Sequence, residues 1–257
     1  MLYTEYKPPR DLALWVGCFW RIVGHATDGA SFQHRVLPDG CADVLFDLAG
    51  ASVELVGPMT VAQVIELSGV VDVLGVRLRP GAIAAFGRVR ADELLDVAVP
   101  FSLGISPAQL TQAADFAAKL RLVIEALRAR VSALEGPDQL VRHALGRLAR
   151  AEAPDFPSIS VLTRDLGLSE RAFQRRFVAN VGLTPVSYRR LARLRSVLRL
   201  HAEGARGWAS IAASTGFSDQ AHLVRDCRAF TGLTPREWAV TQVARAGFLQ
   251  DGLVTTI

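Results

Sequence analysis

The four residues GLTP occur twice in this chain of 257 residues, at 182–185 and at 232–235. Each copy has a similar tripeptide upstream, GLS at 167–169 and GFS at 216–218. Glycine commonly ends a helix, serine or threonine caps the next one, and proline is tolerated in a first turn. Two such sets in the same order predict a repeated unit of two short helices joined by a tight turn.

Each set predicts the layout of a helix-turn-helix motif. The second helix of each unit is called its recognition helix below. In the first unit it covers residues 169–181, and in the second unit it ends before Gly232. The residues expected to cap or end the four helices are Ser158, Gly167, Ser169, Gly207, Gly216, and Ser218 or Asp219.

The first recognition helix has one apolar and one basic face. Phe173 and Phe177 are four residues apart, so they are expected to be buried together. The opposite face carries Arg171, Gln174 and Arg175. Arg and Gln are the side chains whose donors and acceptors match the edges of guanine and adenine in the major groove. This face therefore predicts sequence-specific contacts with DNA.

The second recognition helix follows the same plan but is less basic. Leu223 and Cys227 are its expected buried pair. The side chains expected to face outward are those of Gln220, Ala221, Val224 and Arg225. Its charges sum to zero, whereas those of the first recognition helix sum to +2. We therefore expect the first helix to contribute more of the sequence reading.

Residues 185–203 predict one helix that connects the two units. Its apolar stripe consists of Tyr188, Leu191, Leu194 and Leu198, and its other faces carry Arg189, Arg190, Arg193, Arg195 and Arg199. A helix of this length spans about 28 Å. Because successive major grooves on one side of B-DNA are about 34 Å apart, such a rigid helix can hold two recognition helices in neighbouring grooves.

Charge is distributed unevenly along the chain. Residues 1–149 carry 14 basic and 16 acidic side chains, whereas residues 150–257 carry 15 basic and 9 acidic ones, and all 15 are arginine. An arginine-rich C-terminal part joined to a nearly neutral N-terminal part indicates a polyanionic partner for the former. The alternative is a basic face that is only solvated.

Residues 158–240 resemble the DNA-binding domain of the AraC/XylS family of transcription regulators. In the second unit the resemblance rests on Ile211-Ala212, GFSDQAHLVRDC with Phe230, and TGLTPREW at 231–238. In the first unit it rests on GLSERAFQRRF and GLTPVSYRR. The sequence departs from the family at Thr163, where a small residue is usual, and at Cys227, where an aromatic residue is usual.

The resemblance implies an all-α domain of seven helices, over residues 158–246, that binds double-stranded DNA in two adjacent major grooves. It places the base contacts on Arg171, Gln174, Arg175, Gln220, Ala221 and Arg225. We expect phosphate contacts from Ser169, Arg176, Arg189, Arg190 and Ser218. The resemblance thus implies a sequence-specific, DNA-binding transcription regulator.

Residues 1–106 have the pattern of a β-rich domain. Runs rich in Val and Leu at 41–48, 52–57 and 73–80 are separated by turn signals, which predicts short strands of a sandwich or small barrel. Trp15, Phe19 and Trp20 are expected in its core. RVLPDGCADVLFDL and GVRLRPGA resemble the sensor half of a subgroup of the same regulators, which implies a cupin-like β-roll. The expected fold class is therefore α+β, with two domains.

A small-molecule effector is expected to bind in this N-terminal domain. Arg77 and Arg79 alternate with Val76 and Leu78, so they share a face and either bind an acidic effector or are solvated. A metal site built from His34, Asp39 and Cys41 is disfavoured, because the turn at 37–40 and a buried thiol explain the last two. No cofactor and no catalytic residue are expected.

Residues 107–152 predict a helical hairpin between the two domains. Ser106 caps its first helix and Gly136-Pro137 breaks it, and residues 153–157 read as a linker. The apolar stripe of the first helix comprises Leu110, Phe116, Leu120, Val123, Leu127, Val131 and Leu134. It either packs on the β-rich domain or forms a dimer seam, because its near-heptad spacing suits a partner helix.

Three classes of protein fit these features to different degrees. The first is a regulator controlled by an effector, with RNA polymerase and a second copy of the chain as further partners. The second is an enzyme or DNA-repair protein with an appended DNA-binding domain, and the third is an architectural DNA-binding protein, which would favour lysine-rich tracts and wedge residues. We expect a cytoplasmic protein without a membrane span, because its three cysteines are widely spaced and charges interrupt every long apolar window.

Overall fold

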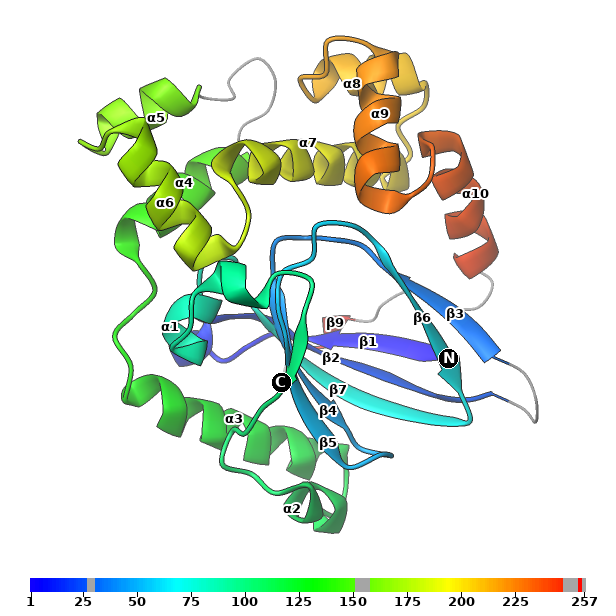
Figure 1. Ribbon diagram of the computed structural model, residues 1–257. Helices are drawn as coiled ribbons and strands as arrows, with labels where there is room; N and C mark the ends of the chain where they lie inside the picture. The colour runs from blue at the N-terminus through cyan, green and yellow to red at the C-terminus, as the bar shows by residue number, and fades with distance from the viewer. Residues whose placement is uncertain (27–30, 151–157, 247–253, 256–257) are drawn as a thin grey trace.

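The computed structural model describes residues 1–26, 31–150, 158–246 and 254–255, and it contains a β-rich N-terminal domain and a helical C-terminal domain (Figure 1). The main sheet has the strand order β8-β5-β4-β7-β2-β1-β9, and β3 pairs with β6 in a separate two-stranded ribbon. The strands are β1 (Leu2–Tyr6), β2 (Val16–His25), β3 (Ser31–Val36), β4 (Ala42–Asp47), β5 (Ser52–Val56), β6 (Gln63–Ser68), β7 (Val70–Leu78), β8 (Ala98–Pro100) and β9 (Val254–Thr255). The strands predicted from the three apolar runs are confirmed as β4, β5 and β7.

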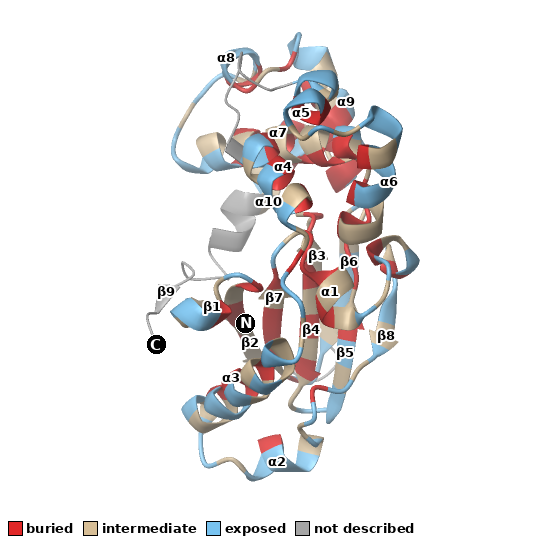
Figure 2. Cartoon of the chain, turned by 90° about the vertical axis from the view of Figure 1, so that its left-hand side faces the viewer, coloured by how far each residue is buried: buried red, intermediate tan, exposed pale blue. Residues whose placement is uncertain are grey.

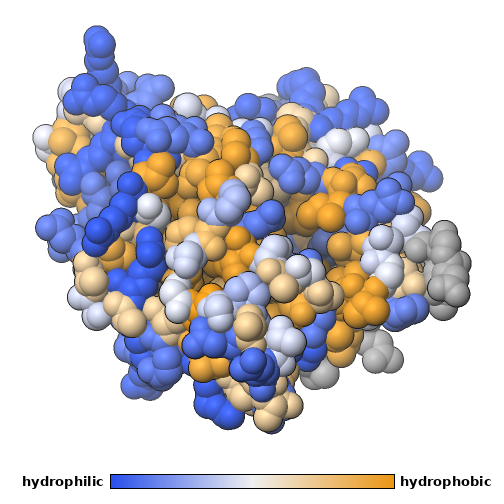
Figure 3. Space-filling view, turned by 60° about the horizontal axis from the view of Figure 1, so that its bottom comes forward, coloured by the Kyte–Doolittle hydropathy of each residue, from blue (hydrophilic) through white to orange (hydrophobic). Residues whose placement is uncertain are grey.

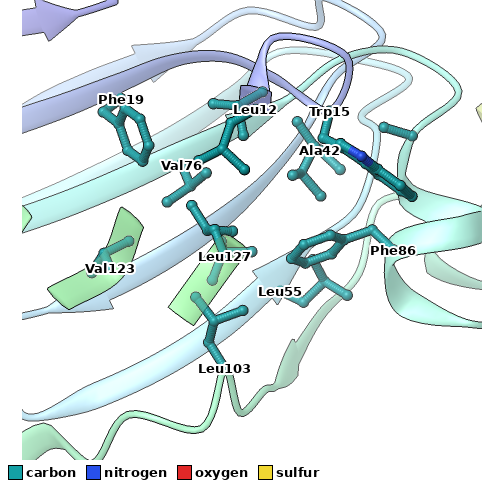
Figure 4. Packing of buried hydrophobic residues seen from close by; sticks show 14 of the residues in the cluster. Leu12, Trp15, Phe19, Ala42, Leu55, Val76, Phe86, Leu103, Val123 and Leu127 are labelled. Atoms are coloured by element: carbon teal, nitrogen blue, oxygen red, sulfur yellow. The ribbon is translucent and has the colours of Figure 1, made fainter. Parts of the chain in front are cut away.

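One face of the main sheet forms the core of the N-terminal domain (Figure 4). Phe19 and Val76 on the central strands β2 and β7 are fully buried there, and Trp15 packs beside Phe86. Phe86 belongs to α1 (Ile83–Gly87), which precedes the 3-10 turn η2 (Ala91–Leu94). All three predicted core residues are buried: Trp15 and Phe19 belong to this core, and Trp20 belongs to a smaller cluster on the opposite face, because side chains alternate along a strand.

The apolar stripe expected in the helical hairpin is divided between two helices that pack on this sheet. Ser106 caps α2 (Pro107–Gln112) in a capping box with Gln109, and Asp115 caps α3 (Phe116–Ser132). Val123 and Leu127 of α3 are fully buried in the N-terminal core. The alternative of a dimer seam along this stripe is therefore wrong, because the chain's own sheet covers it.

The helical hairpin over residues 107–152 is also wrong as a unit, because its two halves belong to different cores. α4 (Gln139–Arg150) follows α3, and its Val141, Ala144 and Leu148 are buried with residues of the C-terminal domain. That domain therefore begins near residue 139 rather than 158. The expected linker at 153–157 lies outside the described residues.

Within the described residues, α4 is the first of seven helices in the C-terminal domain. The others are α5 (Ile159–Asp165), α6 (Glu170–Val181), α7 (Pro185–Ala202), α8 (Trp208–Ser214), α9 (Gln220–Thr231) and α10 (Pro235–Ala246). The two repeated turns do the same work: Gly182 and Gly232 end α6 and α9 at φ 82° and 74°, which glycine adopts without strain. Thr184 caps α7 by accepting from the Ser187 amide at 3.1 Å.

Buried residues of the C-terminal domain gather around α7, which contacts α4, α6, α8 and α9 (Figure 2). In the part of the chain that the structure describes, none of the helices is both long and apolar enough to cross a membrane. The α+β fold of two domains is confirmed.

Candidate nucleic-acid interface

The first recognition helix is α6, and its two faces are those predicted. Phe173 and Phe177 are fully buried, with ring centroids 5.5 Å apart. Ser169 caps the helix by accepting a hydrogen bond from the Ala172 amide at 3.2 Å. The exposed face carries Arg171, Gln174 and Arg175. Three long polar side chains thus project together from a helix that is fixed on its opposite side.

The second recognition helix is α9. Leu223 and Cys227 are fully buried as expected, and burial raises the pKa of the Cys227 thiol. Asp219 caps the helix through the His222 amide at 2.6 Å, and this hydrogen bond lowers the pKa of the Asp219 carboxyl. The exposed side chains include those of Gln220, Ala221 and Arg225. The structure therefore leaves all six candidate base-contacting residues open to solvent.

The candidate phosphate-contacting residues fall into two groups. Ser169 and Ser218 are exposed at the N-terminal ends of the recognition helices, and Arg189 is half-buried on α7. Arg176 and Arg190 are engaged within the chain. Arg176 forms an ion pair with Asp138, which precedes α4.

Arg190 forms the second internal ion pair. Its Nη2 donates to Asp226 of α9 at 2.8 Å, and its guanidinium stacks on Phe230 at 5.4 Å from the ring centroid. The Asp226 side chain is only 3% exposed. Nothing in the sequence indicated this pair, and Asp226 counted there only toward the net charge of the second recognition helix.

Arg193 of α7 was expected only as part of the basic faces of the connecting helix, whereas the structure gives it a specific role. Its Nη1 donates to the carbonyl oxygen of Gly216 at 3.0 Å, and its guanidinium lies 5.1 Å from the centre of the Phe217 ring. The pKa of Arg193 is lowered, mainly by burial. This arginine fixes the turn of the second unit onto the connecting helix. The Gly-Phe-Ser tripeptide, which corresponds to Gly-Leu-Ser in the first unit, marked that turn but did not reveal the arginine.

α7 carries one helix-turn-helix unit at each end, as Figure 1 shows. α5 and α6 stand near its N-terminal end, and α8, α9 and α10 surround its C-terminal half, where α7 contacts α8 and α9. In the same view the N-terminal domain lies on the side of α7 opposite to α5 and α8.

The N-terminal domain contacts the C-terminal end of each recognition helix through the loop between β5 and β6. A Cβ added to Gly182 would lie 3.3 Å from Cγ of Pro58 and 3.1 Å from the carbonyl oxygen of Ala91. At the other unit, the Ala62 amide donates to the carbonyl oxygen of Phe230 at 2.7 Å. Arg35 of β3 adds a bond to the Thr231 carbonyl at 3.0 Å.

A cleft of about 490 Å³ lies between the turn at 37–39, α7 and α10. Arg195 and Arg199 line it. Arg195 donates to the carbonyl oxygen of Asp39 at 3.1 Å, and Arg199 pairs with Glu203 at 3.0 Å. The two domains thus also meet along the middle of the connecting helix.

The two arginines proposed for the effector have separate surroundings. Arg77 on β7 lies within ion-pair distance of Glu5, Asp39 and Asp43, at 3.4 to 3.7 Å. Arg79 follows the end of β7 and donates to the carbonyl oxygen of Ala13 at 2.7 Å. Both side chains therefore already have partners within the chain. The described residues hold no cluster of His, Cys, Asp and Glu suited to a metal ion.

Two helix-turn-helix units on one connecting helix, each with an exposed polar recognition face, define a DNA-binding domain. Comparison with known families agrees: residues 162–240 match the model of a helix-turn-helix domain. The C-terminal part of the chain therefore belongs to the AraC-type helix-turn-helix domains. Residues 4–100 match the model of a domain of unknown function, DUF6597. No curated protein matches the chain significantly.

Several solved structures resemble the chain at low sequence identity. An apo variant of ToxT from Vibrio cholerae is 13% identical, covers 86% of this chain and 97% of its own, and has a TM-score of 0.46. Wild-type ToxT with an unsaturated fatty acid bound is 13% identical over 86% of this chain and 94% of its own, with a TM-score of 0.41. The DNA-binding domain of AdpA in complex with a target DNA is 23% identical over 44% of this chain and 96% of its own, with a TM-score of 0.35.

Proposed function

We propose that the chain is a sequence-specific transcription regulator that reads two unlike half-sites in adjacent major grooves. The observation that carries this proposal is the pair of exposed recognition faces at opposite ends of α7. Each face is fixed by a buried pair on the reverse side of its helix. An Arg-Gln-Arg face and a Gln-Ala-Arg face offer different donors, so a single chain would read a site without internal symmetry.

The first recognition helix is proposed to contribute more of the specificity. Arg171 and Arg175 flank Gln174 on its exposed face, whereas the second helix presents one exposed arginine, Arg225, within its proposed reading face. Arginine binds guanine through two parallel hydrogen bonds, which is the commonest specific contact in the major groove. The proposed phosphate contacts of Ser169, Ser218 and Arg189 would fix the register of both helices.

An effector bound by the N-terminal domain is proposed to control DNA binding. The contacts of Pro58 and Ala62 with the C-terminal ends of the two recognition helices support this, because one loop touches both units. A shift of that loop would change how the two recognition helices are oriented relative to each other. RNA polymerase and a second copy of the chain are further proposed partners. No catalytic step is proposed.

Selection of bound sites from random double-stranded DNA, at a stated salt concentration, tests the function directly. The expected result is a bipartite site with two different half-sites whose centres are about one helical turn apart. The matched control is the double variant Arg175→Ala with Arg225→Ala, which should still fold but lose enrichment at one base pair in each half. Equal recovery of all sequences by the unaltered chain would refute sequence-specific regulation.

A further inference from the structure

A groove on the N-terminal domain, apart from the cleft at α7, brings together two arginines and an apolar wall. It encloses about 380 Å³ between α1, the loop at 101–104 and the C-terminal part of α3. Arg88 and Arg130 line it together with Leu103 and Leu134. Figure 3 brings the side of α2 and α3 forward, and hydrophobic and hydrophilic surface alternate there. Ligand sites for small molecules have volumes of this order and combine apolar walls with few polar groups.

Arg130 is held rigidly at one side of the groove. Its Nη2 and Nε donate to the carbonyl oxygen of Phe86 at 2.7 and 3.1 Å. Its guanidinium lies 4.9 Å from the Phe86 ring centre and 5.0 Å from that of Phe101. These contacts use two of the three nitrogens, so Nη1 keeps its donors for another acceptor.

Arg88 lines the same groove and has a strained, left-handed backbone conformation. It follows the end of α1 at φ 54°, whereas α6 and α9 end on glycines at comparable positions. A side chain in the left-handed region is costly, and such strain is concentrated at ligand-binding positions. Arg88 makes one long hydrogen bond, to the Ala133 carbonyl at 3.4 Å.

The two guanidinium groups lack an acidic partner. Among the residues that the structure describes, no carboxylate lies within 4.0 Å of either arginine. Burial and the neighbouring charge of Arg88 lower the pKa of Arg130, so the two cations disfavour each other. An anion placed between them would remove that repulsion and accept hydrogen bonds from both.

We propose that this groove binds a small organic acid, whose carboxylate pairs with Arg88 and Arg130 while its apolar body lies against Leu103 and Leu134. The apolar wall makes an inorganic anion alone a poor match. Two arginines in its lining make a neutral or cationic ligand a poor match.

The groove is connected to the first recognition helix through a short stretch of chain. Both α1 and η2 contact α6. Arg88 is three residues before Ala91, whose carbonyl oxygen lies against Gly182 at the end of α6. An acid that draws Arg88 toward Arg130 would therefore act on the segment that supports this helix. This consequence rests on the proposed function, whereas binding itself does not.

Isothermal titration of the full chain with octanoate and with benzoate tests the site in the absence of DNA. We expect at least one of the two acids to bind. The matched alcohols, octanol and benzyl alcohol, lack the charge and should bind at least about tenfold more weakly. Arg88→Gly should lower the affinity for the acid by about tenfold. Because glycine accepts a positive φ, this variant should fold at least as well as the unaltered chain.

Arg88→Lys keeps the charge and should retain most of the affinity. Arg199→Ala is the control for the cleft at α7, and it should leave the affinity unchanged. Failure of both acids to bind, equal binding of acids and alcohols, or a loss with Arg199→Ala instead of Arg88→Gly would each overturn the proposal. The calorimetry contains no DNA and the site selection contains no acid, so failure of one proposal is distinguishable from failure of the other.

Discussion

The Ala62 amide donates a hydrogen bond of 2.7 Å to the carbonyl oxygen of Phe230, joining the N-terminal domain to the last turn of the second recognition helix. Pro58, four residues earlier in the same loop, lies against Gly182 at the end of the first recognition helix. One loop therefore contacts both ends of the tandem reading unit. Its position fixes part of the geometry with which two grooves would be read together.

Ala62→Pro removes this hydrogen bond because proline has no amide hydrogen. The bond contributes about 1 kcal/mol. We compare the affinity for the selected site with the affinity for a site whose half-site spacing differs by one base pair, and we expect the ratio of the two affinities to fall about fivefold. Affinity for an isolated half-site should not change. Binding titrations on the three DNAs measure both quantities. The matched control is Val61→Pro in the same exposed loop, and an equal effect of the two prolines would contradict the role of the Ala62 amide.

Arg175→Ala and Arg225→Ala compare the two recognition helices at positions aligned by the repeat. Loss of a bidentate contact with guanine costs about 1–3 kcal/mol of discrimination at one base pair. We expect Arg175→Ala to lose more of this discrimination than Arg225→Ala, since α6 has the more basic exposed face. Binding to single-base variants of the selected site measures it. Equal losses would mean that both units contribute similarly.

The helix ends and caps of the C-terminal domain were predictable because they depend on neighbouring residues alone. Gly182 and Thr184 mark a helix end and the following cap, and both do so in the structure. The apolar stripe at 110–134 was predictable in its period but not in its partner. Hydrophobic spacing shows that a face will be buried, and it does not say against which surface.

The contacts between domains left no trace in the sequence. Ala62 and Phe230 meet through an amide and a carbonyl, groups that nearly every residue has. Asp226 was missed for a different reason. A carboxylate in a recognition helix is normally solvated, and only the fold shows that Arg190 covers this one.

Arg190→Ala should destabilise the C-terminal domain by about 3 kcal/mol, because it leaves the carboxylate of Asp226 buried without its partner. Asp226→Ala should cost less, since Arg190 is 39% exposed and can regain water. Denaturant unfolding of both variants and of the double variant measures the coupling.

The salt dependence of DNA binding tests whether Arg190 also contacts phosphate. Loss of a phosphate contact lowers the slope of affinity against salt by about one unit, whereas loss of folding stability does not. Because the guanidinium of Arg190 is already paired to Asp226, we expect Arg190→Ala to have the same slope of DNA affinity against salt concentration as the unaltered chain. Arg189→Ala is the matched comparison on the same helix, and it should lower the slope.

Stability of the N-terminal domain should fall as the pH rises through about 6, because of Asp43. Burial raises the pKa of this carboxyl from its ordinary value to about 6, against the opposing effects of Arg77 and of the hydrogen bond from Trp20 Nε1 at 2.7 Å. Between about pH 4 and pH 6, Asp43 is therefore protonated in the folded chain but already ionised in the unfolded chain. The free energy of unfolding is highest at the acidic end of this window and falls as the pH rises.

Asp43→Asn removes the titration while keeping an acceptor for the Trp20 indole. The difference in unfolding free energy between the two chains should change by about 1–2 kcal/mol between pH 4 and pH 7. Tryptophan fluorescence during urea unfolding follows it, because Trp20 contacts the group that titrates. Asp47→Asn is the control for a general charge effect. Asp47 is the last residue of the same strand, and its carboxylate accepts hydrogen bonds from the Ala49 and Gly50 amides. If the pH dependence of the unfolding free energy persists unchanged in Asp43→Asn, it must arise from other groups.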